Sequence, residues 1–330
     1  MKLSRLGEFG LIERIRRMTA TGPSVRIGIG DDCAWVKHAA GSSLITADLL
    51  IEGVHFDLKW TSLFALGYKS LAVNLSDIAA MGGVPAYAIV SLGIPATFAS
   101  QQIDEFYRGF NSLARKHQVA LIGGDTNSSP TLIVSVCLIG APLARPVRRS
   151  GAKAGDDIYV TGTLGDSALG LEQLRKNARG ANSLAVRKLL ARHHRPTPRL
   201  SAGALLAREK LATAMIDVSD GLLQDLGHIC KASHTGAVIF NEQLPLSAAY
   251  RALSGKNRTR FALGGGEDYE LLFCARPRHR QQIEQLHDRA QVKITRIGGC
   301  VAAEQGITVI DGSGKPLALR FTGHDHFKKQ

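Results

Sequence analysis

The sequence contains few cysteines and no long apolar run. Its five cysteines are odd in number, and no two stand at the spacing of a metal clamp. A disulfide framework or a zinc site is therefore not expected, and a reducing cytosol fits best. No uncharged apolar stretch reaches the roughly 18 residues of a membrane span, and the first residues lack the apolar core of a signal peptide. We therefore predict a cytoplasmic protein without membrane contact.

Several catalytic signatures are also missing. The chain has no G-x-x-x-x-G-K-[ST] sequence, no paired H-R-D and D-F-G sequences and no G-x-S-x-G sequence. These absences exclude a Walker-type phosphate loop, a protein-kinase site and a nucleophile elbow. Aromatic residues make up 6% of the chain and are not interleaved with basic residues, so we expect no nucleic acid as partner. Salt-sensitive RNA binding without kinase or ATPase activity would favour that alternative.

The composition describes a globular protein with a surplus of positive charge. The chain has 330 residues, 45% of them hydrophobic, which is enough for about two domains. The formal net charge of +13 favours anionic partners such as nucleic acid, an acidic membrane or phosphorylated metabolites, and charge alone does not choose among them. Residues 141–156, "APLARPVRRSGAKAGD", combine prolines, glycines and basic residues in the manner of a linker. We predict a boundary there, with domains at 1–144 and 145–330.

Apolar periodicity predicts a mixed α/β (α+β) chain. Residues 192–199, "RHHRPTPR", are interpreted as a basic surface loop, with His193 and His194 facing solvent. Helices are predicted at 8–18, 62–81, about 100–117, 166–176 and 220–232, and one more between 199 and 213. Strands are predicted at 25–30, 43–49, 86–95, 119–124, 131–140, 157–162 and 214–219, and near 236–240, 270–275, 293–298 and 307–310.

Five apolar segments end in carboxylates. They are "RIGIGDDCAWV", "LITADLL", "LIGGDTN", "MIDVSDG" and "LGGGEDYE". Each single aspartate can be a turn or helix cap, and Asp220 is expected to cap the helix that follows it. The whole set needs a common cause, because clustered carboxylates repel one another unless cations hold them together. Mg²⁺ prefers such oxygen ligands and is often bound by one or two carboxylates together with the phosphates of a substrate.

Two further features agree with phosphate chemistry. Asn74 and Asp77 are three residues apart in an apolar helix, so they share one face, and Asp77 stands where the helix dipole disfavours negative charge. Two explanations of this pair are open: the side chains organise a metal ion or a phosphate, or they form a solvated polar stripe on the helix. The glycines of "VTGTLGDSALG" could offer backbone N–H groups to a phosphate at a helix start, although the segment taken alone favours an ordinary turn.

Taken in order, nine segments resemble the thiamine-monophosphate kinase family, which belongs to the aminoimidazole-ribonucleotide-synthetase-like (PurM-like) superfamily. The resemblance covers essentially the whole chain. The segments are "GEFGLI", "GIGDDCA", "AVNLSDIAAMG", "LIGGDT", "RSGAKAGDDIYVTGTLGDSALG", "HHRPTPR", "IDVSDGLLQDLGHICKAS", "GGGEDYELLF" and "GHDHF".

This resemblance implies ATP-dependent phosphorylation of thiamine monophosphate to thiamine diphosphate, the last step in making that cofactor, with several Mg²⁺ ions. It also implies two α/β domains, a homodimer formed through the N-terminal sheets, and an active site between the domains. The acceptor is itself an anionic phosphate, so no general base is required. The remaining task is to neutralise and align two polyanions for in-line transfer.

The family pattern also implies roles for individual residues. Asp125, Asp217 and Asp220 are expected to act in catalysis. The metal set is Asp32, Thr46, Ala47, Asp48, Asp77, Asp125, Asp217 and Asp220. The ATP set is Tyr107, Gly124, Asp125, Arg149 and Ser219. The thiamine-phosphate set is His55, Glu267 and His324.

The chain departs from the family at two positions, since the family commonly has an aromatic residue at His324 and often threonine at Ala47. Imidazole offers a thiamine ring less stacking area than tryptophan or tyrosine. Other superfamily members, a selenophosphate synthetase or the purine cyclo-ligase, are alternatives. The selenium enzyme is disfavoured because the first cysteine, Cys33, follows the Asp31–Asp32 pair. A non-catalytic nucleotide-binding scaffold is a third interpretation.

Overall fold

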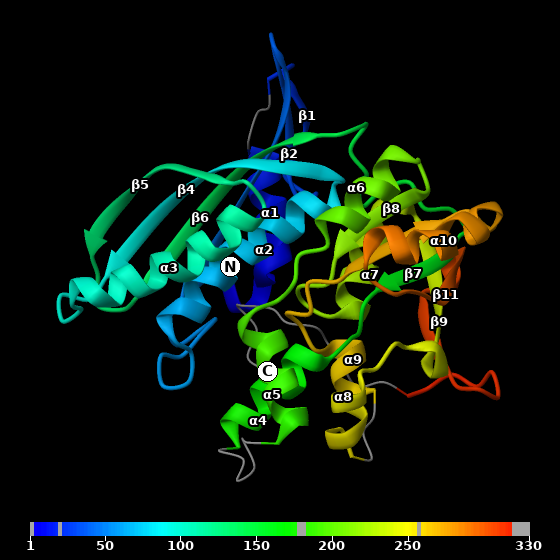
Figure 1. Ribbon diagram of the computed structural model, residues 1–330. Coiled ribbons are helices and arrows are strands. Elements are labelled where there is room, and N and C mark those ends of the chain that lie inside the picture. Colours follow the sequence, from blue (N-terminus) through cyan, green and yellow to red (C-terminus); the bar gives the residue numbers. More distant parts are fainter. Residues whose placement is uncertain (1–2, 19–21, 177–182, 256–258, 319–330) are drawn as a thin grey trace.

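The fold has two mixed α/β halves, each built on a six-stranded sheet (Figure 1). It was obtained as a computed structural model, which describes residues 3–18, 22–176, 183–255 and 259–318. Every helix in these ranges falls short of the length and apolar character that crossing a membrane requires. His324 lies outside the described residues.

The first sheet has the strand order β1-β2-β3-β6-β4-β5. Its pairs are antiparallel except for β4 and β5, which run parallel. The strands are β1 (Val25–Ile27), β2 (Ala34–His38), β3 (Gly41–Ile51), β4 (Gly83–Ile94), β5 (Ala120–Ser128) and β6 (Ile133–Pro142). The helices of this half are α1 (Leu3–Met18), α2 (Leu63–Ala80) and α3 (Ser100–Lys116).

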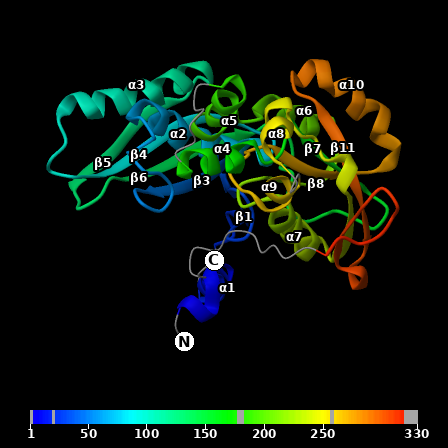
Figure 2. The same cartoon turned by 90° about the horizontal axis from the view of Figure 1, so that it is seen from below.

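Helices α2 and α3 cover one face of this sheet, and Figure 2 shows α3 above strands β4 to β6. The Ser62 hydroxyl accepts from the Ala65 N–H at 3.2 Å and thereby caps the start of α2. The two helices cross where they lack side chains. A Cβ on Gly67 would lie 1.9 Å from the Phe106 carbonyl oxygen, and one on Gly109 would lie 1.9 Å from that of Phe64. Glycine at both positions therefore permits the close crossing.

The second sheet has the strand order β12-β9-β11-β7-β10-β8 and is covered on both faces. Successive strand residues alternate between two cores. Ile158 and Val160 pack with α7 on one side, whereas Tyr159 packs with α6 and α10 on the other. The strands are β7 (Asp157–Thr161), β8 (Ala212–Asp217), β9 (Thr235–Phe240), β10 (Leu271–Ala275), β11 (Ile294–Ala302) and β12 (Ile307–Ile310). The α-helices are α4 (Asp166–Arg175), α5 (Leu184–His194), α6 (Leu200–Arg208), α7 (Leu222–Ser233), α8 (Ala248–Leu253), α9 (Arg260–Gly264) and α10 (Arg280–Ala290), with 3₁₀ turns at Asn241–Gln243, Pro277–His279 and Ala303–Gln305.

Helix α2 joins the halves, because it packs on its own sheet and also against α6. A Cβ on Gly203 in α6 would lie 2.0 Å from the carbonyl oxygen of Ala79 near the end of α2. This contact fixes the C-terminal end of α2 beside the second sheet, which brings Asp77 of the first half close to residues of the second.

The prediction of a mixed α/β fold is confirmed, but several helices and one strand were not predicted. Strand β2 and helices α5, α8, α9 and α10 were not predicted. The interpretation of His193 as a solvated loop residue was wrong. It lies in the last turn of α5 with 4% of its surface exposed, because α5 packs that turn against α4 and the core. The boundary between residues 144 and 145 stays a prediction.

Candidate functional site

Three carboxylates from separate parts of the chain meet between the two halves. Asp32 precedes β2, Asp77 lies in the last turn of α2, and Asp217 ends β8. One carboxylate oxygen of each lies within 4.8 Å of those of the other two. Asp32 and Asp217 are buried, and each has one oxygen, Oδ2, with no hydrogen-bond partner among the described residues. Unsatisfied buried carboxylate oxygens in such a group fit a hard divalent cation.

Strand β3 adds two residues to this carboxylate cluster. The Thr46 hydroxyl donates to Asp77 Oδ2 at 2.5 Å, and the charge of Asp48 acts on Asp77. Burial, followed by the charges of Asp48, Asp217 and Asp32, raises the pKa of Asp77 well above its usual value. Burial and the charge of Asp32 raise the pKa of Asp217 to about 8, and burial raises that of Asp48 to about 6. The cluster therefore favours protons, or a metal, over bare negative charge.

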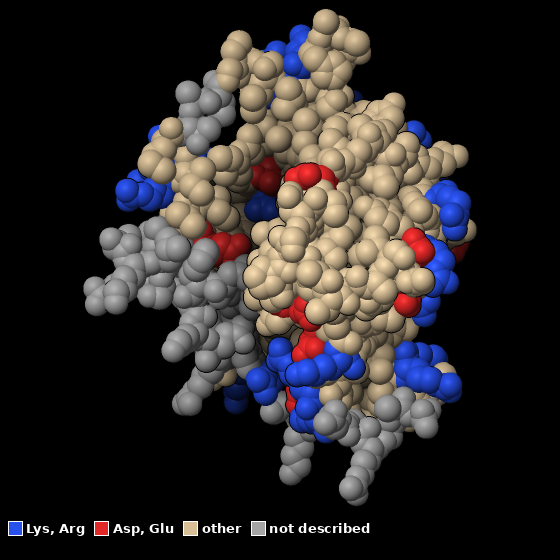
Figure 3. All heavy atoms as spheres, turned by 90° about the vertical axis from the view of Figure 1, so that its left-hand side faces the viewer, with Lys and Arg blue, Asp and Glu red and all other residues tan. Residues whose placement is uncertain are grey.

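Arg149 holds the Asp31–Asp32 turn. Its guanidinium pairs with Asp32 at 2.7 Å, and its backbone N–H donates to Asp31 Oδ1 at 3.1 Å. The two neighbouring carboxylates thus contact different groups of Arg149, its backbone and its guanidinium. Asp31 is not part of the cluster with Asp77 and Asp217. Even with this cation beside it, burial keeps the pKa of Asp32 above its usual value. On the side drawn in Figure 3, acidic side chains lie in and around a hollow that also shows a basic one.

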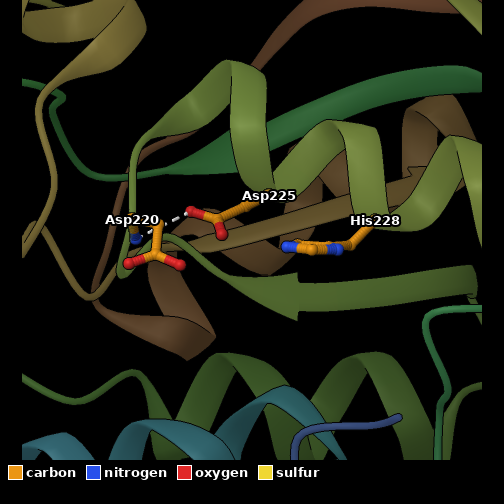
Figure 4. A group of neighbouring side chains, drawn as sticks. All are labelled: Asp220, Asp225 and His228. Carbon is orange, nitrogen blue, oxygen red and sulfur yellow. Dashed lines mark hydrogen bonds between the residues drawn. The ribbon is translucent and has the colours of Figure 1, made fainter. Parts of the chain in front are cut away.

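A second group lies at the start of α7, where Asp220, Asp225 and His228 each offer a ligand atom within 4.8 Å of the others (Figure 4). The prediction that Asp220 caps α7 was wrong. Gly221 is the N-cap residue, and Asp225 accepts the backbone N–H groups of Asp220 at 3.2 Å and Gly221 at 3.0 Å. Asp220 is thereby free of the capping role and accepts from Gln224 Nε2 at 3.0 Å.

His55 lines a cavity of about 210 Å³ between the loop after β3 and helices α4 and α5. The Ile51 N–H donates to His55 Nδ1 at 3.0 Å, so the neutral ring carries its proton on Nε2. Trp60, Arg175 and His193 line the same cavity. It therefore offers an aromatic surface, a cation and a directed N–H donor, which suit a heterocycle that carries a phosphate.

Glu267 is held beside this cavity by an ion pair between the two halves. Its Oε1 lies 2.6 Å from Lys69 Nζ on α2, and its Oε2 lies 3.2 Å from His193 Nδ1. Burial alone would raise the pKa of Glu267, but the charge of Lys69 and the hydrogen bond with His193 together outweigh burial and leave this pKa below its usual value. Burial and the charge of Lys69 lower the pKa of His193, so its ring is neutral at pH 7. Glu267 therefore remains an anion.

Asp125 does not join the carboxylate cluster within one chain. Along the first sheet it aligns with Ser91, Ser135 and Leu49, so its side chain points to the face that α2 and α3 leave uncovered. Asp48 belongs to the opposite face, and three strand spacings, about 14 Å, separate β3 from β5. Asp125 accepts instead from the Thr126 N–H and from the Asn127 amide.

The remaining predicted residues lie at several places. Gly124 is required by strand packing, since a Cβ there would lie 1.8 Å from the Val90 carbonyl oxygen. Tyr107 lies on α3 with its ring edge-on to Phe106, and Ala47 is exposed on β3. The Ser219 carbonyl accepts the Glu267 N–H at 2.7 Å, which links the segment after β8 to the segment that carries Glu267.

The backbone N–H groups at the start of α4 are not available to bind a phosphate. The Asp268 carboxylate accepts the Gly165 N–H at 2.5 Å and the Ser167 N–H at 3.3 Å, so the protein's own carboxylate occupies that end. The sequence reading also gave no role to Lys69, Asp225 or His228. The sequence contains one sign that Lys69 has a role, because it is a charged residue in a mostly apolar helix.

The comparisons with known proteins agree over nearly the whole chain. Residues 30–141 match the family model "AIR synthase related protein, N-terminal domain", and residues 153–311 match the corresponding C-terminal domain. Thiamine-monophosphate kinase of Escherichia coli K12 is 41% identical over 97% of this chain and 98% of its own, and that of Bacillus subtilis is 37% identical over 98% and 100%.

Solved structures show the same relationship. "AaThiL complexed with AMPPCP and TMP" is 35% identical, covers 99% of both chains and superposes with a TM-score of 0.85. Thiamine-monophosphate kinase from Stenotrophomonas maltophilia is 41% identical over 94% of this chain and 98% of its own, with a TM-score of 0.78. With its two α/β halves and a buried carboxylate cluster between them, this chain belongs to the thiamine-monophosphate kinase family.

Proposed function

We propose that this chain transfers the γ-phosphoryl group of ATP to the phosphate of thiamine monophosphate, which gives ADP and thiamine diphosphate. The observation that carries the proposal is the meeting of Asp32, Asp77 and Asp217 from both halves of the chain. It is supported by full-length relatives of that name and by a homologous structure that holds AMPPCP and TMP. The reaction is a phosphotransfer to a phosphate acceptor and would complete thiamine diphosphate synthesis.

The residues at the cluster fit Mg²⁺. Asp32, Asp77 and Asp217 would hold it, because their pKa values are raised and Asp32 and Asp217 each have an unpartnered buried oxygen. Asp48 and Asp220 would be further ligands. Bound there, Mg²⁺ would neutralise charge on the phosphates. The Thr46 hydroxyl orients Asp77, and Arg149 fixes Asp32 from the other side. These contacts hold the carboxylates in place before substrates arrive.

The cavity that His55 lines suits the acceptor. His55 Nε2–H can donate to the substrate, and Glu267, anchored by Lys69, contacts His193 in the lining of that cavity. The acceptor phosphate is anionic at neutral pH, so its oxygen needs no general base. The chain's contribution is therefore to align donor and acceptor and to exclude competing water.

Asp125, Gly124 and Tyr107 enter this proposal through a homodimer. Strand β5, which carries Gly124 and Asp125, is an edge strand of the first sheet, and α3, which carries Tyr107, covers one face of that sheet. The other, uncovered face carries exposed apolar residues such as Leu49 and Tyr87. A second copy packed on this face would bring its β5 to the nucleotide of the first. Domain limits of 1–144 and 145–330 and a cytoplasmic location belong to the same proposal.

Phosphorus NMR tests the reaction directly. We expect the purified protein with ATP, Mg²⁺ and thiamine monophosphate to form thiamine diphosphate and ADP, and to form neither without the acceptor. Replacement of Asp217 or Asp125 by alanine should lower turnover at least about 10³-fold while circular dichroism stays unchanged. Near-normal turnover in Asp217→Ala would overturn the role of the cluster, and ATP consumption without thiamine diphosphate would overturn the substrate.

A further inference from the structure

A second, larger cavity lies at the junction between the two halves. Its volume is about 480 Å³, and it is lined by the segment that follows β6, the end of α6 and the start of β8. Thr213 in its lining stands four residues before Asp217, about 13 Å away along the strand. The cavity is thus separate from the carboxylate cluster and from the cavity that His55 lines.

Three cations line this junction cavity, and none of its lining residues is acidic. They are Arg145, Arg148 and Lys210, and all three are exposed. Within the described part of the chain, their side chains form no ion pair or hydrogen bond. Other arginines near carboxylates behave differently: Arg149, Arg192, Arg199, Arg280 and Arg296 are each paired with an aspartate or glutamate. Three uncompensated positive charges around one cavity repel one another unless an anion joins them.

The backbone next to Arg148 is held by hydrogen bonds. The Arg148 carbonyl accepts the Met215 N–H at 2.9 Å. The Ser233 hydroxyl accepts the Gly151 N–H at 3.1 Å and donates to the Arg149 carbonyl at 3.1 Å. Anchoring on both sides lowers the entropic cost of binding a ligand in this position. Val147 and Ala207 add an apolar surface between the charges.

From these features we propose that the junction cavity binds the diphosphate group of a small metabolite. A terminal diphosphate carries about three negative charges at neutral pH, which matches the three cations. The apolar surface adds contact area for a ring attached to the diphosphate, and a nucleoside diphosphate and thiamine diphosphate share this chemistry. The site is additional to the proposed phosphotransfer reaction and does not depend on it.

Calorimetric titration in EDTA tests the proposal, because without metal the carboxylate cluster repels phosphates and the junction cavity does not. Pyrophosphate, ADP and thiamine diphosphate are titrated separately, and the tightest of the three identifies the source of the diphosphate. We expect one site per chain for each ligand. Absence of heat and of binding by equilibrium dialysis at millimolar ligand would overturn the proposal.

The variant Arg145→Gln/Arg148→Gln/Lys210→Asn removes the three charges. Asparagine is chosen because Lys210 has φ of 54°, a conformation that asparagine tolerates. We expect binding at least about tenfold weaker. The control Arg187→Gln/Lys188→Gln/Arg251→Gln removes the same charge from exposed positions elsewhere and should bind like the parent protein. If both variants bind the ligands equally weakly, the loss of affinity comes from net charge alone, and the proposal of a binding site in the junction cavity is wrong. Thermal unfolding checks that both fold.

Discussion

The two sheets of this molecule differ in how completely they are covered. In the second sheet, every residue of β7 and β10 is buried, because helices pack on both faces. In the first sheet, helices cover one face, and the other exposes apolar side chains such as Leu49 and Tyr87, each at 50%. A contiguous exposed apolar face marks an interaction surface. The second sheet is therefore covered within one chain, whereas the uncovered face of the first sheet is the surface on which the proposed homodimer would form.

Charge placed on the uncovered face should have the largest effect. We expect Leu49→Glu/Tyr87→Glu to convert the proposed dimer to monomer, because paired carboxylates would be buried at the interface without partners. Analytical ultracentrifugation should show a dissociation constant at least about 10³-fold higher. Ile307→Glu, on the edge of the second sheet and 38% exposed, is the control that should leave the mass unchanged. If the parent protein is a monomer at micromolar concentration, the uncovered face of the first sheet does not form a dimer interface.

The ion pair that joins the halves provides a sharper test. Lys69→Met should destabilise the protein by about 1–3 kcal/mol, because it leaves the partly buried carboxylate of Glu267 without its cation. The double variant Lys69→Met/Glu267→Gln removes both charges and should recover most of that loss. Urea unfolding of the two single variants and the double variant measures the coupling. If the single losses simply add in the double variant, the pair does not hold the two halves together.

The smallest expected effect concerns pH. The unfolded aspartate has a pKa of about 3.9, whereas burial and Asp32 raise that of Asp217 to about 8 in the folded protein. The folded state therefore holds more protons, and stability in EDTA should fall as pH rises from about 4 to about 8. Mg²⁺ replaces those protons, so it should raise the melting temperature by a few degrees more at pH 8 than at pH 6.

Thermal unfolding at both pH values, with and without Mg²⁺, measures this effect. Asp217→Asn is the matched variant, and it should be more stable than the parent in EDTA at pH 8 and should gain less from Mg²⁺. An equal Mg²⁺ effect at both pH values would contradict the assignment of the cluster as the proton-binding and metal-binding group.

Local patterns were sufficient for most of the first half. The apolar run of α2 predicted that helix within a residue at each end, and alternating apolar residues predicted β4 and β6. Helix α10 was missed because charged and polar residues dominate it, and only Ile283, Leu286 and Ala290 face the core. Its tertiary contacts therefore decide its structure, as is common for a weakly apolar helix.

The sequence by itself determined the family and the positions of the carboxylates, because motif order and spacing are properties of the chain alone. Only the tertiary structure decided which carboxylates meet. Asp32, Asp77 and Asp217 converge because α2 packs against both sheets, whereas Asp125 points to the other face of its strand. The burial of His193 and the pairing of Lys69 with Glu267 likewise depend on contacts between distant segments. Sequence spacing carries no information on such distances, which the packing of helices and sheets sets.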